Sequence, residues 1–150
     1  MANDQYSIQK STGYWITRLA RSMERDFEKR LEPLGVTRGA FAVLSAIHHE
    51  KKAKPAELAA FLGVDGAAVT RHLDGIEKRG LIERIPSATD RRSTDINLTA
   101  SGRSAVRRGL TDSEATNAKF TAGLEATEVD QLQAIIQTML AKSGVSVADI

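Results

Sequence analysis

The chain has 150 residues, 41% hydrophobic and 27% charged, values typical of a single soluble globular domain. Cysteine is absent, which excludes disulfide bonds, thiolate metal sites and cysteine-based redox switching. The net charge of +2 is unevenly distributed: residues 51–110 carry twelve Lys/Arg and seven Asp/Glu, a balance of +5, whereas the two flanks together carry −3. A basic centre between acidic flanks predicts a polyanionic partner.

Membrane and secretory segments are not expected. No uninterrupted apolar run approaches the ~18–20 residues that a membrane-spanning helix needs. The first residues have neither a basic segment nor an apolar core, so we expect no secretory signal and a cytoplasmic location. Residues 1–7 and 143–150 are predicted to be tails.

Two amphipathic helices are predicted first. From Ile8 to Leu31 apolar residues recur at helical spacing, and Pro33 and Gly35 end this helix. Thr37 is a suitable N-cap for the second helix. The apolar residues of this second helix are Phe41, Val43, Leu44 and Ile47.

A helix–turn–helix is predicted next. Pro55 suits the first turn of a short helix over residues 55–62, and Gly63 suits its left-handed C-terminal cap. Asp65 is a suitable N-cap for a further helix that ends at Gly80. The predicted buried stripe of that helix is Val69, Leu73 and Ile76.

After Gly80 the apolar period changes from helical to alternating, which predicts two strands with one apolar face. The residues assigned to that face are Leu81, Glu83, Ile85, Thr94, Ile96 and Leu98. Residues 86–93 connect the strands through a polar and basic loop that is longer than a tight hairpin needs. A loop of this kind is a wing.

Two further helices complete the chain. Thr99 is expected to cap a helix from Ala100 to about Phe120, and Thr127 with Asp130 forms an approximate capping box for the last helix. The apolar stripe of the last helix is Val129, Leu132, Ile135, Ile136, Met139 and Leu140. The predicted fold is mainly α (α+β): a winged helix–turn–helix over residues 37–99, with a helical dimerisation region formed by residues 8–36 and 100–142.

This pattern resembles the MarR family of transcriptional regulators. The matching segments, quoted in order, are Pro55–Ala59, Gly63-Val64, Val69–Arg71, Leu73, Ile76–Arg84, Asp90–Arg92 and Leu98–Gly102. The resemblance implies a homodimer that binds a palindromic operator in double-stranded DNA and acts as a repressor. It also implies release of DNA by a small aromatic or phenolic effector. One subgroup senses peroxide through a cysteine in its first helix, and this chain has none.

The helix after Asp65 is the predicted recognition helix, because the major groove admits one helix whose N-terminal residues reach base edges. Arg71 suits either a guanine or a phosphate, and Thr70 suits a phosphate. Ala67 and Ala68 are compatible with contacts to thymine methyl groups or simply with helix formation. The predicted DNA-binding residues on this helix are Gly66, Ala67, Ala68, Thr70 and Arg71.

The wing carries the second DNA-binding prediction. By resemblance to the family, Arg92 enters the minor groove while Asp90 holds its guanidinium, and Arg91 contacts a phosphate. A narrow minor groove concentrates negative potential, which attracts an inserted arginine. The alternative is a basic loop that adds only non-specific attraction.

Other cations are weaker candidates for phosphate contacts. Lys51, Lys52 and Lys54 are equally compatible with solvated surface. Arg79 is a further candidate, and Arg84 is compatible either with a phosphate or with an ion pair to Glu83 or another local acid.

A ligand site is predicted between the helical region and the winged domain, formed by Tyr14, Trp15, Arg18 and His48. An aromatic acid would stack on Trp15 and pair with Arg18. The alternative places Trp15 in the core and Arg18 on the surface. His48 and His49 point to different sides of a helix, so no metal site is expected, and no cofactor.

Two other classes of function compete with DNA binding. The sequence has no phosphate-binding glycine loop, nucleophile elbow or HExxH helix, so we do not expect an enzyme. A winged-helix module that binds another protein, without specific DNA binding, is the alternative. The basic segment Asp90-Arg91-Arg92 favours DNA over that alternative.

Overall fold

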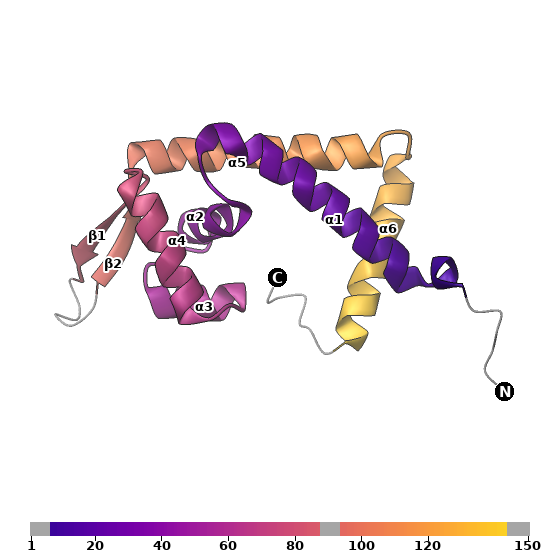
Figure 1. Ribbon diagram of the computed structural model, residues 1–150, viewed down its shortest axis with the longest axis horizontal. Coiled ribbons are helices and arrows are strands. Elements are labelled where there is room, and N and C mark those ends of the chain that lie inside the picture. Colours follow the sequence, from indigo (N-terminus) through magenta and orange to yellow (C-terminus); the bar gives the residue numbers. More distant parts are fainter. Residues whose placement is uncertain (1–6, 88–93, 144–150) are drawn as a thin grey trace.

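The computed structural model describes residues 7–87 and 94–143, and it places a winged unit at one end of a long helical arm (Figure 1). The arm consists of α1 (Thr12–Leu31), α5 (Ala100–Thr121) and α6 (Ala126–Lys142). The winged unit consists of α2 (Arg38–His49), α3 (Pro55–Leu62), α4 (Gly66–Lys78), β1 (Ile82–Pro86) and β2 (Thr94–Leu98). Short 3₁₀ helices, η1 (Ile8–Lys10) and η2 (Glu32–Leu34), flank α1. In the described ranges, no helix combines the length and apolarity that a membrane span requires.

The core of the molecule surrounds α2, which contacts α3, α4, α5 and β2. Its inward residues have almost no exposed surface, and the predicted stripe of α4 is buried with them. The start of α5 closes this core through Ala105 and Val106. The fully buried large side chains are Leu31, Leu44, Leu58, Leu73, Ile76, Ile96, Val43, Val69 and Val106.

Three helix N-caps confirm their predictions. The side chains of Thr37, Asp65 and Thr99 each accept a hydrogen bond from the backbone N–H three residues further on. Each cap satisfies a donor that a helix terminus otherwise leaves unpaired. Gly63 has the left-handed backbone (φ 63°) that closes α3, also as predicted.

The predicted apolar face of β1 is wrong by one residue. The two strands are antiparallel, with Ile82 opposite Leu98, so Ile82 is buried beside it while Ile85 is 38% exposed. The reason lies in Leu81, whose N–H donates to the Ile76 carbonyl and thereby belongs to the turn that ends α4. The strand alternation therefore starts one residue later than the sequence pattern indicated.

Two predicted helix starts are also wrong. The first helix is broken at Ser11, whose extended backbone separates η1 from α1, and the Trp15 indole N–H holds η1 by donating to the Gln9 carbonyl (2.7 Å). The last helix starts at Ala126 instead of Thr127. Its capping box is made by Glu125 and Glu128, because each side chain accepts from the backbone N–H of the other.

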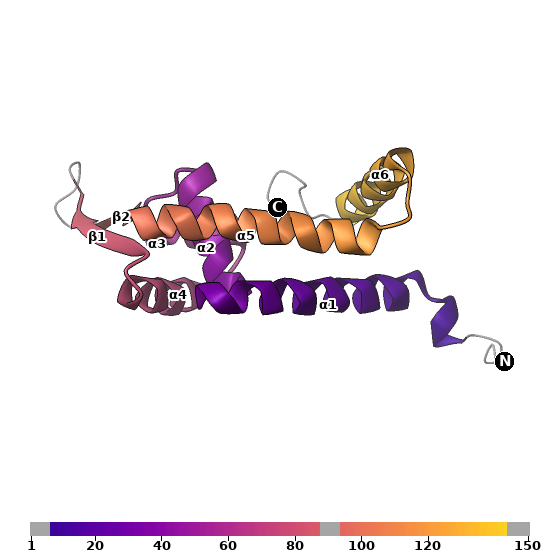
Figure 2. The same cartoon turned by 90° about the horizontal axis from the view of Figure 1, so that it is seen from above.

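The arm leaves much apolar surface uncovered. Viewed from above, α5 lies between α1 and α6, and α1 packs along α5 (Figure 2). Only Leu31 of α1 is buried, and α6 has no buried residue. The exposed large apolar residues on these two helices are Trp15, Ile16, Leu19, Leu132, Ile135, Ile136 and Met139.

A polar cluster fastens α1 to α5. Asp26 accepts hydrogen bonds from Arg30 on its own helix (2.8 Å) and from the buried Thr116 on α5 (3.1 Å), and it also pairs with Lys119 on α5. The hydrogen bonds from Lys119 and Arg30 hold the pKa of Asp26 well below its ordinary value of 3.8.

This cluster predicts an acid-dependent loss of stability. Because the folded-state pKa of Asp26 is depressed, its contribution is complete above pH 3.8 and is lost as the pH falls towards the folded-state pKa. We expect Asp26→Asn to lower stability at pH 6 and to flatten the decline in stability below pH 4. Urea unfolding at pH 6, 4 and 3 measures this, with the exposed Asp130→Asn as control. An unchanged pH slope in Asp26→Asn would contradict the assignment.

Candidate nucleic-acid interface

The helix–turn–helix presents α4 with one face anchored and the other free. Pro55 starts α3 at the first helical position, and the turn after Gly63 leads to Asp65, which caps α4 through Ala68 N (2.8 Å). Val69 and Ile76 are fully buried against the core. The opposite face of α4 is thus held rigidly and stays exposed.

The predicted recognition residues all lie at the N-terminal half of this exposed face. Gly66, Ala67, Thr70 and Arg71 are exposed, and Ala68 is half-buried. The Thr70 hydroxyl donates to the Gly66 carbonyl (2.9 Å), so its proton is already used inside the helix and only its oxygen is left to accept. A bond from Thr70 to a phosphate would require this hydroxyl to rotate away.

Arg71 borders a small basic groove that the sequence did not reveal. His72 of α4 and Arg79, the C-cap of that helix, line this groove together with the segment that starts α2. Two glycines of that segment make room: a Cβ at Gly35 would lie 2.4 Å from Arg79 Nη1, and one at Gly39 would lie 2.6 Å from His72 Nε2. The sequence pattern indicated Arg79 as a phosphate candidate but gave His72 no role, because only packing places it against α2.

Arg84 forms ion pairs, one of the two interpretations left open by the sequence. Its guanidinium donates to Glu77 Oε2 (2.6 Å) and to Asp74 Oδ1 (2.7 Å) on α4. Glu83, its neighbour in sequence, is therefore not one of its ion-pair partners. Two carboxylates neutralise this arginine and tie β1 to α4. In the N-terminal half of α4 itself, the exposed arginine is Arg71.

The wing residues Asp90, Arg91 and Arg92 lie outside the described residues. The strands that lead into and out of the wing are described, and their register sets Pro86 opposite Thr94. The connecting segment therefore starts and ends at the same end of the two-stranded sheet, where the sequence predicted the wing.

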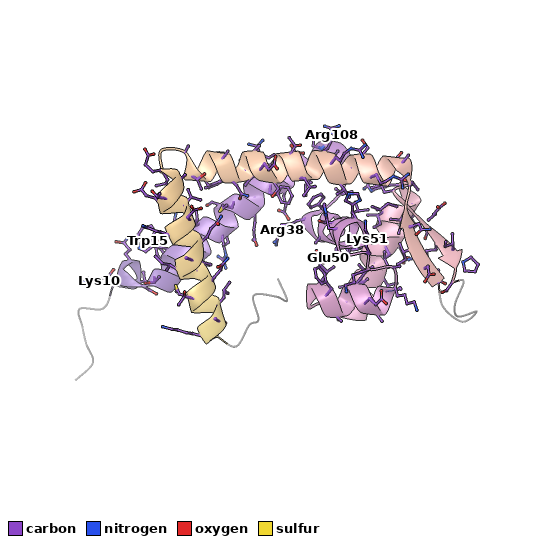
Figure 3. The ribbon with its side chains drawn as sticks, turned by 180° about the vertical axis from the view of Figure 1, so that it is seen from behind. Lys10, Trp15, Arg38, Glu50, Lys51 and Arg108 are labelled. Carbon is purple, nitrogen blue, oxygen red and sulfur yellow. The ribbon has the colours of Figure 1, made fainter. Side chains whose placement is uncertain are left out.

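The four predicted ligand residues do not form one site within the chain. Tyr14 and Arg18 are neighbours, since the Arg18 guanidinium donates to the Tyr14 hydroxyl (2.8 Å), and Trp15 contacts the Tyr14 ring edge-on. His48 instead lines a pocket of the winged unit. Figure 3 shows Trp15 near the far end of the arm and Lys51, just beyond α2, within the winged unit. Trp15 is 55% exposed, so within one chain it is not a core residue.

The arrangement as a whole is that of a winged helix in which one face of α4 is exposed, and comparisons with known proteins agree on the fold. Residues 34–93 match the sequence pattern described as the MarR family. The chain is 31% identical over 133 residues to the transcriptional repressor MprA of Escherichia coli, covering 85% of this chain and 76% of the relative. This chain belongs to the MarR family.

Solved structures place the MarR-family chain in the same fold. The reduced form of MarR from E. coli is 30% identical with a TM-score of 0.76, covering 87% of this chain and 96% of the other. A cysteine-to-serine mutant of E. coli MarR, solved in complex with operator DNA, is 29% identical with a TM-score of 0.75, covering 85% and 92%. Both MarR structures therefore match the arm as well as the winged unit.

Proposed function

We propose that this protein is a homodimeric, non-catalytic transcriptional regulator that binds a palindromic operator in double-stranded DNA in the cytoplasm and acts as a repressor. The observation that carries the proposal is α4: its inner face is locked into the core, and its outer face presents Arg71 behind an N-terminal turn of small residues. An α-helix presented in this way fits the major groove. MarR-family membership and the operator complex of a related MarR support it.

The small residues Gly66 and Ala67 allow the N-terminus of α4 to approach base edges closely. Arg71, one turn further on, is exposed and forms no ion pair among the described residues, so its guanidinium is free to bind guanine or a phosphate. Arg79, which lines the basic groove together with Arg71 and His72, extends the positive surface towards the start of α2. We propose that these three side chains line the path of one DNA strand.

The wing is proposed as the second contact. The resemblance to the family assigns Arg92 to the minor groove, Asp90 to holding it, and Arg91 to a phosphate. The antiparallel register of β1 and β2, which sets Pro86 opposite Thr94, supports this proposal because it brings the two ends of the connecting segment together.

The dimer is proposed from the exposed apolar faces of the arm. Helix α6 has no buried residue in the single chain, yet its apolar side chains align on one face, and α1 exposes Trp15 and Ile16. Apolar patches of this extent on two helices are typical of protein interfaces. A second copy that covers both helices yields the twofold symmetry that a palindrome requires, with half-sites ~34–36 Å apart. A small aromatic or phenolic effector is proposed from family membership.

The test is a fluorescence-anisotropy titration of the promoter region beside the protein's own gene, with a scrambled duplex as control. We expect Arg71→Ala to weaken operator binding at least about 10-fold, since each of two copies loses a contact. Arg108→Ala removes the same charge from the exposed surface of α5 and is expected to leave affinity unchanged. Repeating the titration at two salt concentrations tells a phosphate contact, whose loss reduces the salt dependence, from a base contact.

Weak and equal binding of the wild type to both duplexes would contradict the proposal. It would instead favour a winged-helix module that binds another protein. Equal loss of affinity in Arg71→Ala and Arg108→Ala would contradict the specific role of α4.

A further inference from the structure

The outward face of α1 carries a row of arginines that the proposed function does not use. The members of this arginine row, Arg18, Arg21 and Arg25, are exposed, and none of them forms an ion pair with any described residue. Their Cα atoms lie within about 60° of one another around the helix and span about 10.5 Å along it. The apolar face of α1, with Leu19 and Met23, lies roughly on the other side. A second copy that covers the apolar face would therefore leave the arginine row in solvent.

The arginine row does not stabilise the helix by itself. Its members are three and four positions apart, and like charges at these spacings repel each other on a helix surface. Two of the three carboxylates on α1 are used elsewhere: Glu24 pairs with Arg38 of α2 (3.0 Å), and Asp26 belongs to the cluster that fastens α1 to α5. The third, Glu28, lies three positions beyond the last arginine of the row. The accumulated positive charge is therefore available to an anion.

Side-chain contacts hold two of the arginines in place and leave most of their donors unused. The Arg18 guanidinium lies over the Tyr14 ring, with Cζ 5.5 Å from the ring centre, and donates to the Tyr14 hydroxyl (2.8 Å). Arg25 donates to Ser22 Oγ (3.4 Å), whose own proton goes to the Arg18 carbonyl (2.9 Å). A guanidinium carries five N–H donors in a fixed fork that matches the oxygens of a phosphate. The Tyr14 hydroxyl accepts from Arg18 and so keeps its own proton to donate.

Two adjoining hollows lie along the arginine row. The first has a volume of about 320 Å³, and all of its charged lining residues are arginines of the row. The second has a volume of about 360 Å³ and is bounded by η1 and the first turns of α1. The two hollows share Tyr14, Arg18 and Arg21, and the second also contains Ile8, Ser11, Gly13 and Thr17. A cationic surface thus continues into one of apolar and hydroxyl side chains, at the end of the arm remote from the winged unit (Figure 1).

We infer that the arginine row binds the oligophosphate group of a small molecule such as a nucleoside triphosphate, whose organic part occupies the hollow beside η1. Arginine binds phosphate through two parallel N–H···O bonds, and three guanidinium groups spread over about 10.5 Å suit a chain of phosphates better than a single one. Tyr14 lines both hollows and offers a ring and a hydroxyl donor between them. The site is separate from the exposed face of α4 proposed for DNA, which belongs to the winged unit at the other end of the molecule (Figure 1).

The test uses the full chain without DNA, in a buffer free of Mg²⁺ and at constant ionic strength, so its result does not depend on the proposed function. Isothermal titration calorimetry compares ATP, AMP, adenosine and inorganic triphosphate. We expect ATP to bind at least about 10-fold more tightly than AMP, because AMP offers one phosphate to three guanidinium groups, and adenosine to show no binding. Triphosphate that binds as tightly as ATP would identify the free inorganic ion as the ligand of the arginine row, and weaker binding of triphosphate would identify a nucleotide.

Four variants separate this site from the surface proposed for DNA, which also attracts phosphates. Arg21→Gln and Arg25→Gln are each expected to weaken ATP binding at least about 10-fold. Arg108→Gln removes the same charge from α5 outside both hollows and is expected to change nothing (Figure 3). Arg71→Gln removes it from α4, and ATP binding is expected to persist. ATP binding no tighter than that of AMP, or a loss in Arg71→Gln equal to that in Arg21→Gln, would overturn the inference.

Gly13→Leu tests the hollow beside η1. A Cβ at Gly13 would have only Ser11 Oγ within 4 Å, at 3.7 Å, so a larger side chain fills the hollow without displacing the backbone. We expect this variant to weaken the binding of ATP several-fold and to leave the binding of triphosphate unchanged. Circular dichroism confirms that each variant is folded. Wild-type affinity for ATP in Gly13→Leu, with ATP still preferred to triphosphate, would overturn the placement of the organic part.

Discussion

Replacement of Gly102 by alanine is expected to lower the free energy of unfolding by about 3 kcal/mol or more. A Cβ at this position would lie 1.9 Å from the Leu81 carbonyl oxygen, and that atom belongs to the backbone and already accepts a hydrogen bond from Thr99 N (3.0 Å). Neither the new Cβ nor the Leu81 carbonyl can move aside without displacing the start of α5 from β1. Urea unfolding followed by circular dichroism at a fixed protein concentration measures the change, and the melting temperature should fall by roughly 6–12 °C.

Gly75→Ala provides the matched control. It makes the same substitution inside α4, where no heavy atom lies within 4 Å of the new Cβ. Alanine is the better helix former, so this variant is expected to gain about 0.5–1 kcal/mol. Similar stabilities of the two variants would show that α5 does not approach Leu81 this closely.

Replacement of Ile135 by glutamate is expected to raise the dissociation constant of the proposed homodimer at least about 100-fold, or about 2.7 kcal/mol. Ile135 lies on α6 and is 58% exposed in the single chain, so the substitution removes little internal packing. In a dimer that covers α6, each copy would place an unpaired carboxylate in an apolar interface, which is strongly unfavourable. Sedimentation velocity over a range of protein concentrations measures the change.

Gln137→Glu is the control for this prediction. It introduces the same side chain two residues further along α6, on the opposite side of the helix, and its position is exposed. This variant is expected to dimerise as the wild type does. If Ile135→Glu also keeps the wild-type sedimentation coefficient at every concentration, the apolar face of α6 is not the dimer interface.

Local signals in the sequence predicted the winged unit well. The bounds of α3, the caps at Thr37, Asp65 and Thr99, and the left-handed Gly63 follow from preferences that act within a few residues. The buried stripe of α4 followed from its helical period. For this reason the amino-acid pattern alone identified the exposed face of α4, and with it the candidate recognition residues.

The exact start of a helix or strand was harder to predict where two nearby residues both suit the same role. Glu125 and Glu128 form the capping box where Thr127 and Asp130 were expected, because either pair satisfies the same spacing. In β1 the apolar character of Leu81 suggested the wrong strand face, since Leu81 completes the turn after α4 instead of starting the strand. Only the course of the backbone separates these alternatives.

The sequence by itself determined the family and the order of helices and strands, together with the face of α4 that is exposed, because short-range propensities and periodicity encode them. Tertiary structure alone decided which cations are neutralised: Arg84 is paired with Asp74 and Glu77, while Arg71 forms no ion pair with any described residue. It also separated His48 from Tyr14 and Arg18. Ion pairs and pockets join residues far apart in the chain, and their energies depend on distances that only packing sets.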